Sequence, residues 1–292
     1  MSAADPGPFD DISVSKAGAV IEIMLNRPDR LNPISARVGG TRDQIVQAIA
    51  AAEDDPEIGC VLLLGAGRAF SAGGDVIGNE PRETPGEQIA FLEMSEAFHR
   101  RLRAARLPLM AAVHGYCLGA AMSLVASCDL VIAAASAWFG LPEGRMGLIG
   151  ASALVPIVGR QWTKFLIFTG ELIDAEAARE LGLVLSVEPD ELLLERARDL
   201  AGRLSRMPRE AVLLNKRTVD AVADASGDAA GRIAALGYDA VTLSNGARAK
   251  APDGRSFRDI VATEGIDGMK AAQVAQYREP WLGRSPVRGD SN

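Results

Sequence analysis

Side chains that bind metals or form disulfides are scarce in this chain, whose 292 residues include three cysteines and two histidines. The cysteines are odd in number, and Cys60, Cys117 and Cys128 each lie within an apolar stretch. This favours buried free thiols in a reducing compartment, and we expect the cytoplasm. The spacing of histidines and cysteines matches no metal-ligand pattern, so we expect no metal site. With only His99 and His114, and no Gly-x-Ser-x-Gly elbow, the sequence also argues against a serine hydrolase.

Long apolar runs and an excess of positive charge are also missing. No stretch approaches the roughly 18 apolar residues that span a bilayer, and residues 1–6 lack the charged-then-apolar pattern of a signal peptide, so we expect no membrane partner. The net charge of -7 argues against a nucleic-acid surface. No phosphate-binding Gly-x-x-x-x-Gly-Lys segment occurs, and Phe70 replaces the third glycine of a dinucleotide-binding loop.

Hydrophobic residues make up 48% of the chain, enough for a substantial core. Residues 12–25 alternate as in a hairpin that turns at residues 16–18. Residues 37–53 predict the first helix, and residues 91–107 predict another that places His99 in a solvated or rim position. The polar, breaker-rich residues 78–87 predict a surface loop. Beyond residue 190 helical patterns dominate, at residues 192–204, 209–223, 231–243 and 257–270.

Two junctions between an apolar strand and small residues are the most informative features of the sequence. Residues 60–64 lead through a glycine-rich turn to Ala72-Gly73-Gly74-Asp75, and residues 111–113 lead to Gly119-Ala120 and a short helix. The first turn of a helix has free N–H groups and the positive end of the peptide dipole. An oxygen that becomes negative during a reaction can bind there, so two main-chain donors can converge on one oxygen.

A single carboxylate follows in apolar surroundings. Glu143 comes directly after Pro142 and lies among Phe139, Leu141 and Met146. Such surroundings remove water from a carboxylate, raise its pKa and make it a stronger base. A glutamate after a proline can also simply start a helix. Together with the two junctions, Glu143 favours enolate chemistry.

These motifs resemble those of the crotonase, or enoyl-CoA hydratase/isomerase, family. The matching segments occur in the family's order: residues 25–32, 68–75, 111–129, 139–143, 147–149, 169–171 and 175–182. The resemblance implies an α/β fold of ββα units coiled into a crotonase-like spiral. We expect a disordered tail (residues 1–10), a spiral core with the active site (residues 11–205) and a C-terminal helical trimerisation region (residues 206–292). It also implies a homotrimer or a hexamer built as a dimer of trimers.

The family's substrate is an acyl group carried on coenzyme A, which is part of the substrate and not a separate cofactor. Carried over to this chain, the amides of Gly74 and Ala120 hold the thioester oxygen, and Glu143 is the catalytic side chain. The predicted contacts with coenzyme A are Arg30, Leu31, Ala72 and Gly73, with Arg68 as a weaker candidate. Both arginines could equally be ordinary surface charges.

Position 123 departs from the family hydratases, which carry a second glutamate where this chain has Ser123. Hydration is well served by two carboxylates, whereas moving a double bond from C3 to C2 needs one base and an oxyanion hole. The sequence therefore favours an isomerase that uses Glu143 alone. One alternative is a hydratase that uses Glu143 and a water held by Ser123. Another is a crotonase-fold protein that has lost turnover and serves as a binding or assembly component.

Several other residues have structural interpretations. We expect His114 to be packed and hydrogen-bonded, Asp75 to bind nearby backbone N–H groups, and Asp129 to be structural. The segment after residue 149 is shorter than in most relatives, which can alter the acyl pocket. The aromatic residues at 277–281 either cover a neighbouring subunit's active site or pack on their own subunit.

Overall fold

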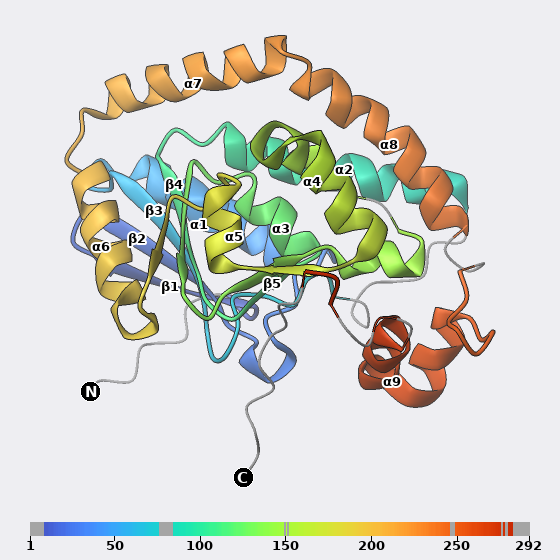
Figure 1. Ribbon diagram of the computed structural model, residues 1–292. Coiled ribbons are helices and arrows are strands. Elements are labelled where there is room, and N and C mark those ends of the chain that lie inside the picture. The colour runs from blue at the N-terminus through green and yellow to red at the C-terminus, as the bar shows by residue number, and fades with distance from the viewer. Residues whose placement is uncertain are drawn as a thin grey trace.

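The computed structural model describes residues 9–75, 84–148, 150, 152–245, 249–275, 277 and 280–282. Its centre is a mostly parallel sheet in the order β1-β2-β3-β4-β6-β9, and a smaller sheet has the order β5-β7-β8 (Figure 1). The strands of the large sheet are β1 (Ile12–Ala17), β2 (Val20–Leu25), β3 (Cys60–Gly65), β4 (Leu109–Val113), β6 (Leu130–Ala134) and β9 (Ser186–Glu188). Those of the small sheet are β5 (Tyr116–Leu118), β7 (Trp138–Gly140) and β8 (Leu172–Asp174).

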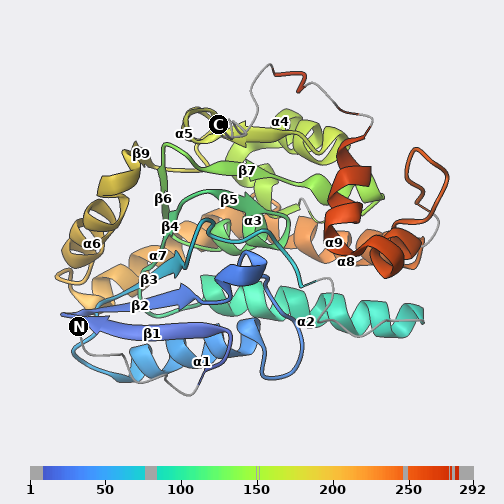
Figure 2. The same cartoon turned by 90° about the horizontal axis from the view of Figure 1, so that it is seen from below.

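The predicted hairpin of β1 and β2 is confirmed, but its turn lies at residues 18–19 instead of 16–18, since residues 16 and 17 still pair with β2 and Gly18 has a φ of 63°. From β2 onward the large sheet is parallel, with Val20 opposite Cys60 and Val61 opposite Leu109. Strand β3 is apolar along its length because both of its faces are covered. Figure 2 shows α1 and α6 at different sides of this sheet.

The two faces of the sheet have separate cores. Val61 and Leu63 of β3 belong to the main core with α1, α2 and α3, whereas Leu62 and Leu64 pack with Ala197 of α6. The helices are α1 (Thr41–Asp54), α2 (Pro85–Arg103), α3 (Ala120–Val125), α4 (Val155–Thr169), α5 (Ala175–Glu180), α6 (Leu193–Leu204), α7 (Arg209–Ala225), α8 (Asp228–Asn245) and α9 (Phe257–Val274). Short 3-10 turns occur at η1 (Pro28–Arg30), η2 (Pro142–Met146), η3 (Ser152–Leu154) and η4 (Asp190–Leu192).

Two predicted helices begin at the wrong residue, and α2 also ends at Arg103, four residues before its predicted end. Helix α1 begins at Thr41 instead of residue 37 because Gly39 has a φ of 70°, outside the helical region. Helix α2 begins at Pro85, because Thr84 and Glu87 form a reciprocal capping box ahead of the predicted start. The last three residues of the predicted loop at 78–87 therefore form the start of α2, Thr84 is its N-cap, and residues 78–83 lie outside the described residues.

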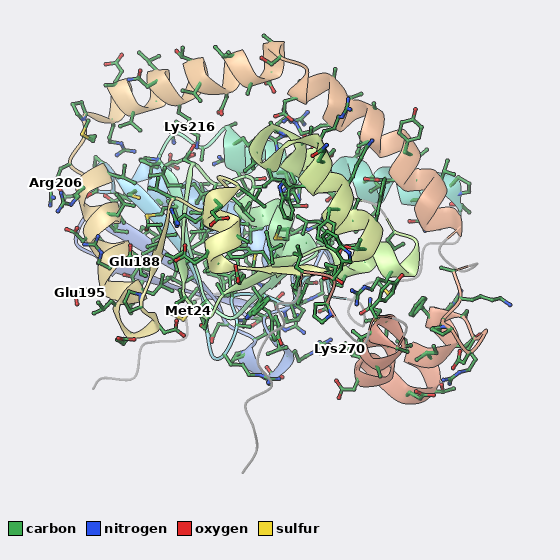
Figure 3. All side chains as sticks on the ribbon, in the orientation of Figure 1. Met24, Glu188, Glu195, Arg206, Lys216 and Lys270 are labelled. Carbon is green, nitrogen blue, oxygen red and sulfur yellow. The ribbon has the colours of Figure 1, made fainter. Side chains whose placement is uncertain are left out.

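Helices α7 and α8 form an arch across the top of the molecule (Figure 1). No residue of α7 is buried, and Lys216 ties this helix to the body through an ion pair of 2.8 Å with Asp129. Figure 3 shows Lys216 on the side of α7 that faces the body. Asp129 also accepts a hydrogen bond from the Leu109 amide, which confirms its structural role.

Helix α9 lies at one end of the molecule and has a small core of its own, formed by Ala251, Phe257, Ile260 and Met269. Met146 of η2 packs against this core. The C-terminal helix therefore contacts the turn that carries Glu143. Within the described residues, no helix combines the length and the apolar character needed to cross a membrane.

Candidate active site

Residues 71–75 lie between the segment that contains Ile34 and the segment that leads from Cys117 to Gly119. The Gly74 amide points toward the second of these segments. On one side, the Ile34 amide donates to Gly73 O (2.8 Å) and the Asp75 amide donates to Ile34 O (3.1 Å). Because successive groups along an extended chain point to opposite sides, the N–H of Gly74 faces away from Ile34. On the other side, Ser71 is bridged to Cys117, two residues before Gly119.

Two glycines allow a close approach between this segment and the start of α3. A Cβ on Gly73, whose φ is 111°, would be 2.9 Å from Leu118 O and 3.7 Å from Ala120 N. A Cβ on Gly74 would be 3.9 Å from the Cβ of Ala120. Within the described part of the chain, we find no hydrogen bond from the amide of Gly74 or of Ala120. The two junctions singled out in the sequence thus lie side by side, with two main-chain donors that have no acceptor among the described residues.

Glu143 lies against the same turn. The η2 turn directs its carboxylate toward Gly119, where a Cβ would be 3.2 Å from Oε2 and 3.5 Å from Oε1. Oε2 is shielded from solvent and has no hydrogen-bond partner among the described residues, although the residue as a whole is half-buried. This loss of water raises the pKa of Glu143 to about 7. Gly74, Ala120 and Glu143 therefore surround one point next to Gly119.

Ser123 lies one turn into α3 and is half-buried. Its hydroxyl makes no hydrogen bond to the described residues, while its carbonyl accepts one from Ser127 Oγ (2.8 Å). Ser127 Oγ is also 3.1 Å from His99 Nδ1. Since the Ser127 hydroxyl proton is used toward Ser123, His99 Nδ1 carries the proton that is donated to Ser127 Oγ.

The predicted rim position of His99 is wrong. Helical spacing gave no sign that this face of α2 meets the turn after α3, where Ser127 contacts the imidazole. Burial, with the charges of Arg42 and Arg103 nearby, lowers the pKa of His99 to about 3. The hydrogen bond predicted for His114 is confirmed, because its Nε2 lies 2.9 Å from Gly67 O, but the residue is half-buried and not packed in the core.

A cavity of about 360 Å³ opens beside Gly74. All four predicted coenzyme A contacts line it, namely Arg30, Leu31, Ala72 and Gly73, and Arg68 does as well. Ala120 and Glu143 are not among its lining residues, so the cavity ends at Gly74, next to the two amides. A second hollow of about 380 Å³ lies between β9 and α6, but no motif residue lines it.

Asp75 also has side-chain partners that the sequence analysis did not name. This carboxylate is 2% exposed and pairs with Arg27 (2.9 Å) and Arg30 (3.0 Å). Both guanidinium groups belong to the motif of residues 25–32 and meet Asp75, the residue after Gly74. The sequence around Asp75 alone gave no indication of these two ion pairs. Asp75 thus connects the predicted coenzyme A contact Arg30 to the segment that carries the Gly74 amide.

Two groups of residues at the site were missed in the sequence. The Asn32 side-chain amide donates to Ala66 O and Ala69 O (both 2.8 Å) and holds the Arg27–Leu31 turn against the turn before residues 71–75. Asn32 has a positive φ of 53°, which is unusual for a residue other than glycine, but a backbone angle cannot be read from a sequence. Helix α9 lines the cavity with Ile266, Asp267, Met269 and Lys270, although it is almost 200 residues away in sequence from Gly74. Figure 3 shows Lys270 on the side of α9 that faces the body.

Sequence comparison matches residues 15–239 to the enoyl-CoA hydratase/isomerase family. A probable enoyl-CoA hydratase of Mycobacterium bovis is 33% identical over 229 residues, which cover 75% of this chain and 84% of that protein. The 2,3-dehydroadipyl-CoA hydratase of Escherichia coli is 35% identical over 203 residues, which cover 68% and 77%.

Solved structures agree with this assignment. An enoyl-CoA hydratase/isomerase of Xanthobacter autotrophicus superposes with a TM-score of 0.84 at 29% identity and covers 92% of this chain and 99% of that one. An enoyl-CoA hydratase of Mycobacterium smegmatis has a TM-score of 0.82 at 23% identity, covering 95% and 98%, and shows the shared fold.

Proposed function

The chain belongs to the enoyl-CoA hydratase/isomerase family, and on that premise we propose that it converts 3-enoyl-CoA thioesters into 2-enoyl-CoA thioesters with Glu143 as its base. The observation that carries this proposal is the position of the Glu143 carboxylate against Gly119, beside two amides that have no acceptor among the described residues. Position 123, where a hydratase of the family has a second carboxylate, holds a serine.

In the proposed reaction the Glu143 carboxylate takes a proton from C2 of the acyl group. The electron pair spreads into a dienolate, and the thioester oxygen becomes negative. The amides of Gly74 and Ala120 donate hydrogen bonds to this oxygen, which stabilises the intermediate. Glu143 then returns the proton to C4, and the double bond lies between C2 and C3. A base with a pKa of about 7 suits this role, because it is partly ionised at neutral pH and can both accept and return a proton.

Hydration of 2-enoyl-CoA is a second candidate, which the names of the relatives favour. The half-buried Ser123 hydroxyl is available to hold a water molecule, since it has no partner within the described residues. Glu143 would then take a proton from this water as its oxygen bonds to C3, the electron pair of the C2–C3 double bond would move onto the thioester oxygen, and Glu143 would return the proton to C2. In both reactions the same oxyanion hole holds the same oxygen, so the substrate offered distinguishes them.

Three basic side chains beside Gly74 support coenzyme A as the ligand of this cavity, which three aspartates also line. Arg30, Arg68 and Lys270 line this cavity and can pair with phosphate groups. The ion pair with Asp75 fixes the guanidinium group of Arg30 at this cavity before any ligand binds. Neither reaction needs a resident cofactor, because coenzyme A enters with the substrate.

Purified protein offered 3-enoyl-CoA and 2-enoyl-CoA separately tests both candidates. An isomerase forms 2-enoyl-CoA from the first and no 3-hydroxyacyl-CoA from the second, whereas a hydratase forms 3-hydroxyacyl-CoA from the second. Glu143→Gln abolishes either activity, and Glu195→Gln, an exposed position on α6 that Figure 3 labels, leaves it unchanged. Full activity in Glu143→Gln would end the proposal.

The proposed assembly is a homotrimer or a dimer of trimers formed through residues 206–292. Helices α7 and α8 expose apolar side chains that a partner can cover: Leu214, Val219, Val222, Ile233 and Val241. Light scattering of the eluted protein measures the mass directly, and a monomer at micromolar concentration would rule this assembly out. The free cysteines, of which Cys60 and Cys117 are buried, suit a reducing compartment such as the cytoplasm.

A further inference from the structure

The η2 turn, which carries Glu143, is too short and too little buried to be fixed by contacts within itself. The η2 turn is five residues long, and none of its residues is fully buried. Its C-terminal end is closed by Leu148, whose amide donates to Glu143 O (3.1 Å). Because a general base must stay within hydrogen-bond reach of its proton, contacts from outside η2 have to fix its position.

Arg145 provides such contacts from the same turn, two residues after Glu143. Its side chain is 10% exposed, and its Nε donates to Thr169 O at the end of α4 (2.7 Å). The stem of Arg145 runs across Gly170, where a Cβ would be 2.7 Å from Cγ. Gly144 is equally close to α4, since a Cβ there would overlap the Ile167 carbonyl. The η2 turn is thus pressed onto the end of α4.

Two further residues surround the guanidinium group of Arg145. Its central carbon lies 4.2 Å from the centre of the Tyr277 ring, a distance typical of a cation–π contact. On the other side Glu171, which is 5% exposed, places Oε1 4.0 Å from a guanidinium nitrogen. Glu171 Oε1 also accepts a hydrogen bond from the Trp281 amide (3.2 Å), while its Oε2 has no partner among the described residues.

These contacts show where the C-terminal residues lie. Tyr277 and Trp281 pack on Arg145, Glu171 and Phe165 of their own subunit, with the Trp281 ring 5.9 Å from that of Phe165. Packing on their own subunit is one of the two arrangements that the sequence left open, and Trp281 is still 80% exposed in this single chain. Arg278 and Glu279 lie outside the described residues.

We propose that Arg145 is a positioning residue for Glu143 and that Tyr277 and Glu171 hold its guanidinium group in place. The inference rests on the proposed role of Glu143 as base. It connects the C-terminal residues to catalysis through one side chain, because η2 carries both Glu143 and Arg145. Displacement of a reacting group by about 1 Å can lower a rate roughly 100-fold, so a loosened η2 affects turnover before it affects substrate binding.

The test compares Arg145→Ala with Arg258→Ala, which removes an exposed cation from α9. In Arg145→Ala we expect kcat to fall roughly 10- to 100-fold while KM stays within about twofold. The apparent pKa of the base in the pH–rate profile falls from about 7 toward its ordinary value, because water reaches a loosened carboxylate. Arg258→Ala leaves all three quantities unchanged.

A second pair of variants keeps the test decisive if Arg145→Ala does not fold. Tyr277 is 38% exposed, so its replacement disturbs the core little. Tyr277→Ala lowers kcat and the apparent pKa, whereas Tyr277→Phe, which keeps the ring face, retains both values. Wild-type kcat and pH profile in folded Tyr277→Ala, or equal losses in both Tyr277 variants, would overturn the inference. The proposed function stands in that case if Glu143→Gln is inactive, so the two failures are distinguishable.

Discussion

The carboxylate of Glu143 lies against the bare Cα of Gly119, where a Cβ would be 3.2 Å from Oε2. Gly119 has a φ of 54° and a ψ of -119°, a backbone conformation that side chains disfavour. The residue that follows it, Ala120, carries one of the two amides that have no acceptor among the described residues. A single glycine therefore makes room for the proposed base and orients one of the proposed oxyanion donors.

Gly119→Ala is expected to lower kcat roughly 10- to 100-fold, because the added methyl group displaces the carboxylate and strains the turn. Steady-state kinetics with the better of the two enoyl-CoA substrates measures the loss. Gly18→Ala is the matched control, since Gly18 also has a positive φ of 63° but a Cβ added there would meet no heavy atom within 4 Å. Equal activity in the two variants would show that the space beside Gly119 is unimportant.

Glu143→Gln should separate stability from activity. The pKa of Glu143 is raised from 4.5 to about 7 in the folded protein. Above pH 7 the buried carboxylate is therefore ionised, which lowers the free energy of unfolding. Wild-type stability therefore falls as the pH rises from about 4.5 to 7, whereas glutamine has no charge to bury. The variant gains on the order of 3 kcal/mol over the wild type above pH 7 and nothing below pH 4.5. Urea unfolding from pH 4 to pH 9 measures the difference, and a constant difference would contradict the burial of this charge.

The sequence predicted those parts of the site that depend on local chemistry. Gly73-Gly74, Gly119-Ala120 and Pro142-Glu143 each follow a strand, and the structure brings them together. The parts it did not reveal depend on contacts between distant segments. Helix α9 meets the cavity, and Ser127 meets His99, through packing that no residue spacing encodes. The boundary of α1 was missed for a smaller reason, the left-handed conformation of Gly39.

Asp75→Asn is expected to weaken both the fold and the binding of acyl-CoA. The buried carboxylate pairs with Arg27 and Arg30, whose side chains are 20% and 34% exposed. Loss of its charge should lower the free energy of unfolding by about 2–3 kcal/mol. This is less than the roughly 3–5 kcal/mol for a fully buried ion pair, because both arginines reach solvent. Urea unfolding and KM for acyl-CoA are the two measurements.

Asp199→Asn is the control for this variant. Its pair with Arg203 is exposed on α6, with side-chain exposures of 46% for the aspartate and 67% for the arginine. We expect a change within about 0.5 kcal/mol and an unaltered KM. An Asp75 variant as mild as this control would remove the proposed link between Arg30 and the segment that carries Gly74.

Lys270→Gln should raise KM for acyl-CoA roughly two- to fivefold at low salt, with kcat unchanged, because an exposed ion pair contributes little energy. Lys270 lines the cavity from α9, and its acidic neighbour Asp267 is 3.8 Å away. The increase shrinks at high salt as the charges are screened. Lys164→Gln, an exposed position on α4, serves as the control. Identical KM values in both variants across salt concentrations would exclude α9 from coenzyme A binding.

A crystal structure of the protein with a non-reactive acyl-CoA analogue tests the central claim most directly. The account predicts the thioester oxygen about 2.7–3.1 Å from the amide nitrogens of both Gly74 and Ala120. It also predicts a Glu143 carboxylate oxygen about 3–3.5 Å from C2 of the acyl group. A thioester oxygen bound elsewhere, or a carboxylate more than about 5 Å from C2, would contradict it.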